Sequence, residues 1–236
     1  MPSIDRPVQA GARGRGRPPA ECAPNPEQLT RIALSAFAAR GYEGASLRTI
    51  AARAGVDPAL LSRRYGSKMG LWKATVDHLG ERMNAFQQTV TELQPGPSGI
   101  PAAERLRRAV RAFVRFNCEV PELGRFFTDE IGHPGERRSY LMERIWHPHA
   151  AFLRTLLGEA RRNARAPAQA VDPDMLLLVL TGMVSMPLMM RSVAEEECRI
   201  ASDTLPERLA RTLESLLLPD EPIPRDPAAP DGETAL

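Results

Sequence analysis

The sequence predicts an all-α protein in which a small N-terminal unit of three helices precedes a larger helical part. Two observations lead to this prediction. Apolar residues recur at helical spacing through most of the chain, and the early segments that contain them begin at capping residues and end at glycine. In addition, only Gly55 and Val56 separate two short helical segments, so these two helices must cross at a steep angle.

The first helix is expected to begin at Asn25 and to end at Gly41. Asn25 is a suitable N-cap, Pro26 fits the first helical position, and Gln28 can reach back to the N–H of the cap. Between these signals the apolar side chains lie at helical spacing: Leu29, Ile32, Ala33, Ala36 and Phe37.

Two short helices and one long helix are expected next, over residues 46–55, 57–65 and 66–93. Gly55 permits the positive φ that the short connection needs, and Val56 fills the joint. This is the spacing of a helix-turn-helix, whose second short helix presents its outward face to a DNA groove.

Beyond residue 93 only the apolar pattern remains. Residues 94–101, rich in proline and glycine, are expected to form a loop with turns. Further helices are expected over 102–120, 121–131, 136–165, 172–194 and 203–217.

Residues 41–72, GYEGASLRTIAARAGVDPALLSRRYGSKMGLW, resemble the DNA-binding signature of the tetracycline-repressor (TetR) family of bacterial transcriptional regulators. The resemblance extends over about residues 26–75. It implies an all-α homodimer with an N-terminal three-helix helix-turn-helix DNA-binding domain. It also implies a larger C-terminal helical domain for ligand binding and dimerisation. The expected parts are a disordered basic arm, the DNA-binding domain with its helix-turn-helix at about 46–66, the effector-binding and dimerisation domain, and a disordered tail, over 1–24, 25–80, 81–218 and 219–236.

The resemblance assigns contacts with the DNA backbone to residues with hydroxyl or cationic groups. These are Ser46, Arg48, Tyr65 and Lys68. Such groups, and a helix N-terminus, suit a phosphate anion. Tyr65 has a second interpretation, in which its ring closes the small core against Phe37 and Leu71.

The outward face of the third helix supplies the candidates for contact with bases: Pro58, Ala59, Arg63 and Arg64. One of the two arginines is expected to grip phosphate instead, because phosphate and sugar take most protein–DNA hydrogen bonds. Ser62 stands where the family usually has a tyrosine that contacts the backbone, and Arg64 stands where histidine is common. Serine can still donate one hydrogen bond to phosphate, and arginine adds charge.

Charge is distributed unevenly along the chain. The first 80 residues contain twelve Lys or Arg and six Asp or Glu, whereas the whole chain has a net charge of +2. A basic segment attracts phosphate backbones of any sequence. A solvated surface that happens to be rich in arginine is the simpler alternative.

The N-terminal arm carries the most regular basic pattern. Arg15 and Arg17, with the intervening glycine and Pro18, resemble the core of an AT-hook, an extended strip that lies in a narrow minor groove. The arm is therefore expected to add affinity for A·T-rich flanks. A solubilising basic tail without a defined partner is the alternative.

The second domain is rich in large apolar side chains. Most are expected to form the core of a helix bundle and a dimer seam. In a more specific interpretation, some of these side chains line a cavity that binds an effector. The candidates are Met83, Phe86, Phe113, Phe116, Phe127 and Trp146. Few acids or bases accompany them, so the effector is expected to be small and largely apolar.

Segments 148–163 and 174–192 are the candidates for a homodimer interface. One apolar stripe on the second segment would be left exposed by a monomer: Leu176, Leu180, Met183, Val184 and Pro187. Two DNA-binding domains in a dimer must lie about 34–36 Å apart to enter successive major grooves.

Nothing in the sequence predicts catalysis. His133, His147 and His149 lie near Asp129 and Glu130 but lack the i, i+4 spacing of a helical zinc pair. No phosphate-binding glycine loop or nucleophile motif is present. We therefore expect no enzyme activity, no metal and no cofactor.

Composition agrees with an ordinary globular protein: 236 residues, 43% hydrophobic and 25% charged. The sequence contains neither an apolar run of 18 or more residues nor a recognisable secretory leader, so no membrane partner is expected. The three cysteines, Cys22, Cys118 and Cys198, form no C-x-x-C pair and are expected to be free thiols in the cytoplasm.

Together these features predict a DNA-binding transcriptional regulator, a repressor that dimerises on a pseudo-palindromic operator and leaves it when a small effector binds. Two alternatives remain open. One is an architectural, nucleoid-type protein that binds double-stranded DNA without a specific operator, and the other is a helical ligand-binding module whose DNA-binding domain is vestigial.

Overall fold

The structure is a computed structural model that describes residues 25–91, 100–163 and 172–217. All regular structure in these ranges is helical, which confirms the predicted all-α fold. The predicted arm (1–24) and tail (219–236) lie outside the described residues.

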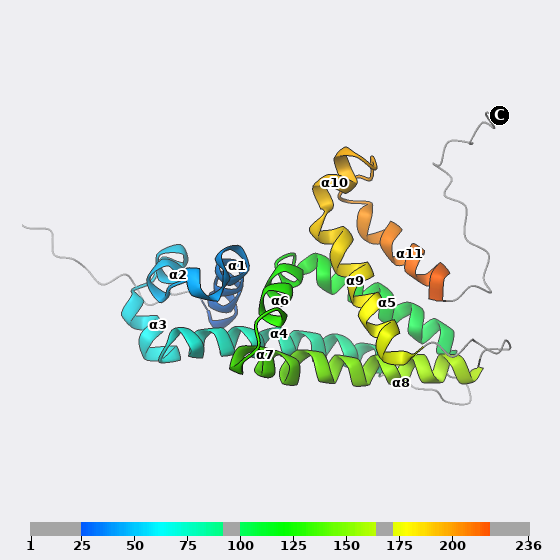
Figure 1. Cartoon of the computed structure of the whole chain (residues 1–236), viewed down its shortest axis with the longest axis horizontal. Coiled ribbons are helices and arrows are strands. Elements are labelled where there is room, and N and C mark those ends of the chain that lie inside the picture. The colour runs from blue at the N-terminus through cyan, green and yellow to red at the C-terminus, as the bar shows by residue number, and fades with distance from the viewer. Residues whose placement is uncertain (1–24, 92–99, 164–171, 218–236) are drawn as a thin grey trace, which may run out of the picture.

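Figure 1 shows the helices, labelled in their order along the chain. Their bounds are α1 (Pro26–Gly44), α2 (Leu47–Ala54), α3 (Pro58–Tyr65), α4 (Lys68–Thr91), α5 (Ala102–Glu119), α6 (Leu123–Ile131), α7 (Glu136–Leu141), the π-helix η2 (Met142–Trp146), α8 (His147–Asn163), α9 (Pro173–Met189), α10 (Arg191–Glu196) and α11 (Leu205–Leu217).

Helices α1, α2 and α3 gather at one end of the molecule, which we call the head (Figure 1). The start of α1 is as predicted, since Asn25 Oδ1 accepts a hydrogen bond from the N–H of Gln28 at 2.7 Å. Gly41 interrupts the helix with φ 68°, a conformation that favours glycine. The core of the head consists of fully buried side chains from each helix, among them Phe37, Ile50 and Leu61.

Helix α4 leads from the head into the rest of the molecule, which we call the body. Its first turns carry Leu71 and Trp72, both fully buried, and its later turns carry Met83. In the body α4 packs against α5, η2 and α8, while α9 crosses α8 and α5, and α11 covers α5 (Figure 1). One helix thus connects the head with the interior of the body.

The segment predicted as one helix over 136–165 contains a widened turn. Pro148 has no N–H and cannot donate to the carbonyl of Arg144 four residues earlier, and the π-helix η2 lies directly before it. At this point α4 approaches very closely, because a Cβ on Gly80 would lie 3.0 Å from the carbonyl oxygen of Arg144. Glycine at position 80 therefore permits the contact between α4 and η2.

The segment predicted as one helix over 172–194 is divided into α9 and α10. The residue between them, Met190, has φ −95° and ψ 28°. Pro187 lies in the last turn of α9 and has no N–H to donate to the carbonyl four residues earlier. Within the part of the chain that the structure describes, no helix is both long and apolar enough to cross a lipid bilayer.

Candidate functional site

Helix α3 presents a polar, basic face to solvent. Its apolar side is anchored by Leu61, which is fully buried in the core of the head. The opposite side carries exposed side chains, and these are the residues that the sequence predicts to face DNA: Pro58, Ala59, Ser62, Arg63 and Arg64.

The orientation of α3 depends on the turn that precedes it. Gly55 adopts the left-handed conformation, with φ 67° and ψ 26°, and the N–H of Val56 donates to the carbonyl of Ala51 at 3.0 Å. Asp57 then caps α3, since its Oδ1 accepts from the N–H of Ala59 at 2.7 Å. These bonds end α2 and start α3 with only Gly55, Val56 and Asp57 between the two helices, a short connection of the kind that the helix-turn-helix prediction requires.

The start of α2 is held by a capping box. Ser46 Oγ accepts from the N–H of Thr49 at 3.1 Å, and Thr49 Oγ1 accepts from the N–H of Ser46 at 3.2 Å. Ser46 and Arg48 are both exposed at this end of the helix. Their predicted contact with phosphate therefore meets no steric obstacle within the head.

Tyr65 and Lys68 are engaged within the protein. Tyr65 is half-buried against the core of the head, and its hydroxyl is buried without a hydrogen-bond partner among the described residues. Lys68 Nζ donates to the carbonyl of Tyr42 at 2.9 Å and lies 4.3 Å from the centroid of the Tyr42 ring. Lys68 thus binds the end of α1, and its role toward phosphate stays a prediction.

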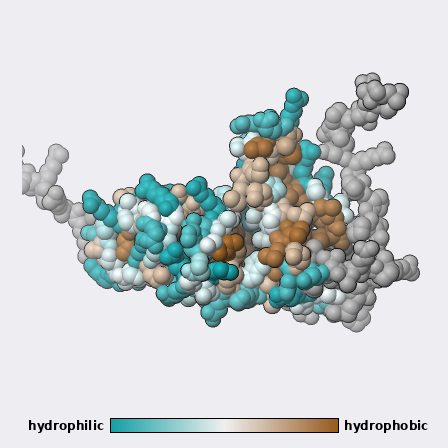
Figure 2. Space-filling view, in the orientation of Figure 1, coloured by the Kyte–Doolittle hydropathy of each residue, from teal (hydrophilic) through white to brown (hydrophobic). Residues whose placement is uncertain are grey.

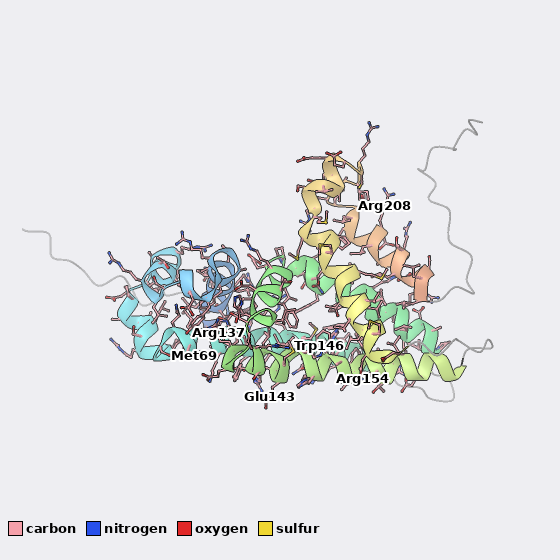
Figure 3. The ribbon with its side chains drawn as sticks, viewed as in Figure 1. Met69, Arg137, Glu143, Trp146, Arg154 and Arg208 are labelled. Atoms are coloured by element: carbon pink, nitrogen blue, oxygen red, sulfur yellow. The ribbon has the colours of Figure 1, made fainter. Side chains whose placement is uncertain are left out.

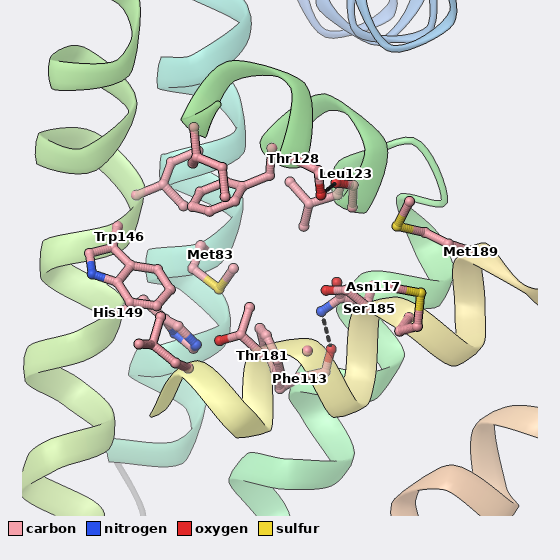
Figure 4. A pocket seen from close by; sticks show the side chains of 17 residues that line it. Met83, Phe113, Asn117, Leu123, Thr128, Trp146, His149, Thr181, Ser185 and Met189 are labelled. Atoms are coloured by element: carbon pink, nitrogen blue, oxygen red, sulfur yellow. Dashed lines mark hydrogen bonds between the residues drawn. The ribbon is translucent and has the colours of Figure 1, made fainter. Parts of the chain in front are cut away.

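The body contains an apolar cavity of about 260 Å³ between α4, α5, α6, α8, α9 and η2. Trp146 and His149 lie on one side of it and Met189 on the opposite side (Figure 4). Its wall contains no Asp, Glu, Lys or Arg. The lining residues are Met83, Phe113, Asn117, Leu123, Gly124, Phe127, Thr128, Ile131, Ile145, Trp146, His149, Leu178, Thr181, Gly182, Ser185, Met186 and Met189.

The structure brings four of the six predicted pocket residues to this cavity: Met83, Phe113, Phe127 and Trp146. Phe86 and Phe116 do not line it. Their rings stack on each other at 6.5 Å, and Phe152 packs edge-on against Phe86 at 6.1 Å. The two rings therefore fill the core beside the cavity.

The sequence did not predict the polar side chains of the cavity wall or the residues of α9 that line it. Asn117 lies one turn after Phe113 on α5, so helical spacing could have indicated it. Thr181 and Ser185 lie on α9, whose apolar residues the sequence analysis assigned to a dimer interface. Only the packing of α9 across α5, α6 and α8 shows which of its faces meets the cavity.

His149 is the one lining residue with a titratable side chain. Its ring is buried and stacks on Phe113 at 4.8 Å, and its Nδ1 lies 3.1 Å from Nε2 of Gln87. Burial lowers the pKa of His149 to about 4, because the apolar surroundings disfavour the charged imidazolium. Its Nε2 is buried and has no hydrogen-bond partner among the described residues. The wall of the cavity is therefore uncharged at neutral pH.

The exposed apolar stripe of α9 differs from the predicted one. Leu180 and Val184 are buried in the core of this same chain, while Met183 and Pro187 are half-buried. The side chain of Leu176 lies outside the described residues. The exposed apolar residues of α9 and α10 form a neighbouring stripe, seen as hydrophobic surface in Figure 2: Met175, Leu178, Val179, Met186, Met189, Met190 and Val193.

A buried carboxylate lies in the part of the body that packs against the head. Glu130 of α6 is 2% exposed and accepts hydrogen bonds from Trp72 Nε1 of α4 and from Arg137 Nε of α7, both at 2.9 Å. The guanidinium of Arg137 also lies 4.0 Å from the centroid of the Tyr42 ring on α1. Because α6 also lines the cavity, Arg137 connects a helix of the cavity wall with the head.

Two of the other histidines, His133 and His147, lie on the surface. His133 is exposed, and its Nδ1 lies 2.7 Å from the carbonyl of Asp129, while His147 is exposed on α8. Within the described ranges, no three His, Cys, Asp or Glu side chains gather in an arrangement that could hold a metal ion.

The fold and the exposed face of α3 define an all-α protein with an N-terminal helix-turn-helix DNA-binding domain. Residues 29–75 match the family model described as bacterial regulatory proteins, tetR family. This match confirms the resemblance of the N-terminal helices to the DNA-binding signature of that family. A comparison of the sequence with curated proteins gave no match.

Solved structures of transcriptional regulators share the fold over most of the chain, each with a TM-score of 0.61. FadR of Bacillus subtilis, in complex with stearoyl-CoA, is 15% identical over 80% of this chain and 96% of its own. KstR2 of Mycobacterium tuberculosis, a ketosteroid transcriptional regulator, is 17% identical over 81% and 92%. AibR, in complex with isovaleryl coenzyme A and operator DNA, is 22% identical over 83% and 99%. These proteins and the matched family are regulators of transcription and not enzymes.

Proposed function

We propose that this protein is a transcriptional repressor that binds a pseudo-palindromic operator as a homodimer and leaves it when a small, largely apolar effector enters the cavity. The observation that carries this proposal is the exposed basic face of α3, presented directly after the left-handed turn at Gly55. An α-helix with small and basic exposed residues fits the major groove of DNA.

The cavity supports the ligand-responsive part of the proposal. Apolar, largely preformed cavities with a few polar groups are the usual form of small-molecule sites. The solved FadR and AibR structures hold acyl thioesters of coenzyme A, which also carry an apolar acyl group. In this chain the wall helix α6 packs against α1 of the head, and Glu130 of α6 binds Arg137, whose guanidinium lies over the ring of Tyr42 on α1. An effector that displaces α6 would therefore change the position of α3.

The surface of α9 supports the dimeric part. Seven large apolar residues of α9 and α10 are exposed, more than scattered single residues on a monomer would explain. A second copy of the chain would cover this stripe and place two heads side by side. The target, bacterial operator DNA, also places the site of action in the cytoplasm.

The basic arm has a proposed role beside the head. Arg15 and Arg17 lie outside the described residues, and the proposal for them stands on their sequence pattern alone. An extended strip in the minor groove would add phosphate neutralisation to the major-groove contacts of α3.

The decisive experiment selects genomic fragments with the purified full chain and maps the bound region by footprinting. A discrete pseudo-palindromic site supports a regulator, whereas uniform coverage supports the architectural alternative. Binding of small molecules without any DNA binding would support the ligand-binding module.

The same operator then tests the role of α3. Replacing both Arg63 and Arg64 by alanine should weaken operator binding at least tenfold and reduce its salt dependence. Arg208→Ala is the matched control, because this exposed arginine projects from α11, far from the head (Figure 3). Equal losses in both variants would contradict the assignment of α3 to DNA.

A further inference from the structure

One buried polar atom in the cavity wall has no partner within the part of the chain that the structure describes. It is Nε2 of His149, on a side chain only 4% exposed. The other buried side-chain atoms without partners belong to residues outside the cavity wall, such as Tyr65 and His78. A buried polar group without a hydrogen bond costs about 1–3 kcal/mol, so a partner supplied by a ligand would recover this cost.

The neighbour of His149 determines which hydrogen-bonding role this atom has. The amide nitrogen of Gln87 lies 3.1 Å from Nδ1 of His149, and an amide nitrogen can only donate. With the Gln87 amide in this orientation, Nδ1 accepts and carries no proton. Since the imidazole is neutral, its single proton resides on Nε2, which makes Nε2 a donor on the cavity side of the ring.

Apart from the hydroxyl of Ser185, the polar side chains in the rest of the wall donate to carbonyls of their own helices. The hydroxyls of Thr128 and Thr181 donate to carbonyls of their own helices, at 2.8 and 2.9 Å. One N–H of Asn117 likewise donates to the carbonyl of Phe113 at 2.9 Å (Figure 4). With no cationic side chain in the wall, a carboxylate would enter without a counter-charge.

We propose that the effector is an uncharged, largely apolar molecule with a carbonyl oxygen that accepts a hydrogen bond from Nε2 of His149. Ketones, esters, amides and thioesters have this chemistry. The proposal rests on the proposed function, because it specifies the ligand of the same cavity. A volume of about 260 Å³ lies near the lower end of ligand sites, which favours a compact apolar body around that carbonyl.

The test compares three probes of similar length with the full chain: methyl octyl ketone, the alkene in which a methylene replaces its carbonyl oxygen, and decanoate. Binding is followed by tryptophan fluorescence, because Trp146 lines the cavity while Trp72 is buried elsewhere. The ketone should bind about tenfold more tightly than the alkene, the effect of one hydrogen bond to a buried donor. Decanoate should bind more weakly than both.

Replacing His149 by phenylalanine keeps a flat ring and removes the donor, so the ketone should lose its tenfold advantage while the alkene still binds. Retained alkene binding shows that the cavity is intact, and His149→Met serves if the phenylalanine variant does not fold. His147→Phe, the same change two residues away and outside the cavity, should keep the preference for ketone.

Three results would overturn the proposal. Equal binding of ketone and alkene to the original protein removes the role of His149 but leaves an apolar effector, and hence the proposed function, in place. If decanoate binds more tightly than the ketone, the effector is not uncharged, while the proposed function again stays in place. If no probe alters the fluorescence and none releases operator DNA, the proposed effector response fails together with the role of His149.

Discussion

His149 combines two properties that rarely occur together in a core residue. It is an ionisable group held neutral by burial, and one of its two ring nitrogens has no partner among the described residues. Stacking on Phe113 and the bond to Gln87 compensate for part of the desolvation. The residue therefore reduces stability at low pH while it keeps a donor at the cavity.

This burial predicts a pH dependence of folding. The pKa of His149 is about 4 in the folded protein and about 6.5 in the unfolded chain, so the unfolded chain binds a proton first as the pH falls. The free energy of unfolding should therefore decrease between about pH 6.5 and pH 4, by about 3 kcal/mol in total, and this contribution should not change further below that range.

Urea unfolding of the original protein and of His149→Phe across this pH range measures the effect. The variant should lack this part of the slope, because phenylalanine does not titrate. Parallel pH profiles for the two proteins would show that His149 is not held neutral by the fold. His147→Phe is the control, since His147 is exposed in the same helix.

The turn between α2 and α3 is the element on which the DNA-binding surface depends. Gly55 has a positive φ, and a Cβ at this position would meet no atom within 4 Å. A side chain here would therefore cost only backbone strain. We expect Gly55→Ala to destabilise the protein by about 1–2 kcal/mol, and Gly55→Asn by less, because asparagine tolerates the left-handed region.

Thermal unfolding and operator titration of both variants test this expectation. The order of stability should be glycine, then asparagine, then alanine, and operator affinity should follow the same order. If alanine is as well tolerated as asparagine, the left-handed turn is not what fixes α3.

The contact of α6 and α7 with the head depends on a partly buried ion pair. Arg137→Ala should destabilise the protein by about 3 kcal/mol, because it leaves the buried carboxylate of Glu130 with only Trp72 as partner. Adding Glu130→Gln to this variant should restore part of the loss by removing the charge. Arg138→Ala, at an exposed position of the same helix, should change stability by less than about 0.5 kcal/mol.

Denaturant unfolding of these variants provides the measurement. If the double variant is less stable than Arg137→Ala, the charge on Glu130 is not the cause of the loss, and the packing of Arg137 on Tyr42 would be the more important term.

The sequence was sufficient to predict where the helices of the head begin and end, but not which face of α9 is buried. Caps such as Asn25 and Ser46 are local signals that act within one turn, and the structure has both. In contrast, α9 is apolar on nearly all sides, so its periodicity does not distinguish the buried Val184 from the exposed Val179. Which face is buried depends on helices far away in sequence.

The cavity shows the same limit. Met83 and Trp146 could be proposed from size and spacing, but Phe86 has the same character and lies in the core instead. Trp146 is also the last residue of the widened turn η2, which changes the direction of the residues after it. A helical period of 3.6 residues cannot predict this change.

In the whole molecule, the cavity and the proposed dimer surface adjoin. Met186 and Met189 both line the cavity and are exposed on the apolar stripe of α9. A partner chain on this stripe would therefore contact the wall that an effector touches. Together with the packing of α6 on α1 of the head, this would give an effector of the proposed dimer two ways to change the distance between the two DNA-binding surfaces.

The exposed stripe of α9 predicts the effect of one charge on assembly. Val179 is 46% exposed and lies outside the cavity wall, so Val179→Glu should leave the fold and the cavity intact. A carboxylate buried at a dimer interface without a partner is strongly unfavourable, and the variant should be monomeric in analytical ultracentrifugation at concentrations where the original protein is dimeric. Operator affinity should fall about a hundredfold or more, because two linked heads bind with a higher effective concentration than one.

Leu216→Glu, at an exposed apolar position on α11, is the control and should remain dimeric. A dimeric Val179→Glu variant would place the interface on another surface of the body.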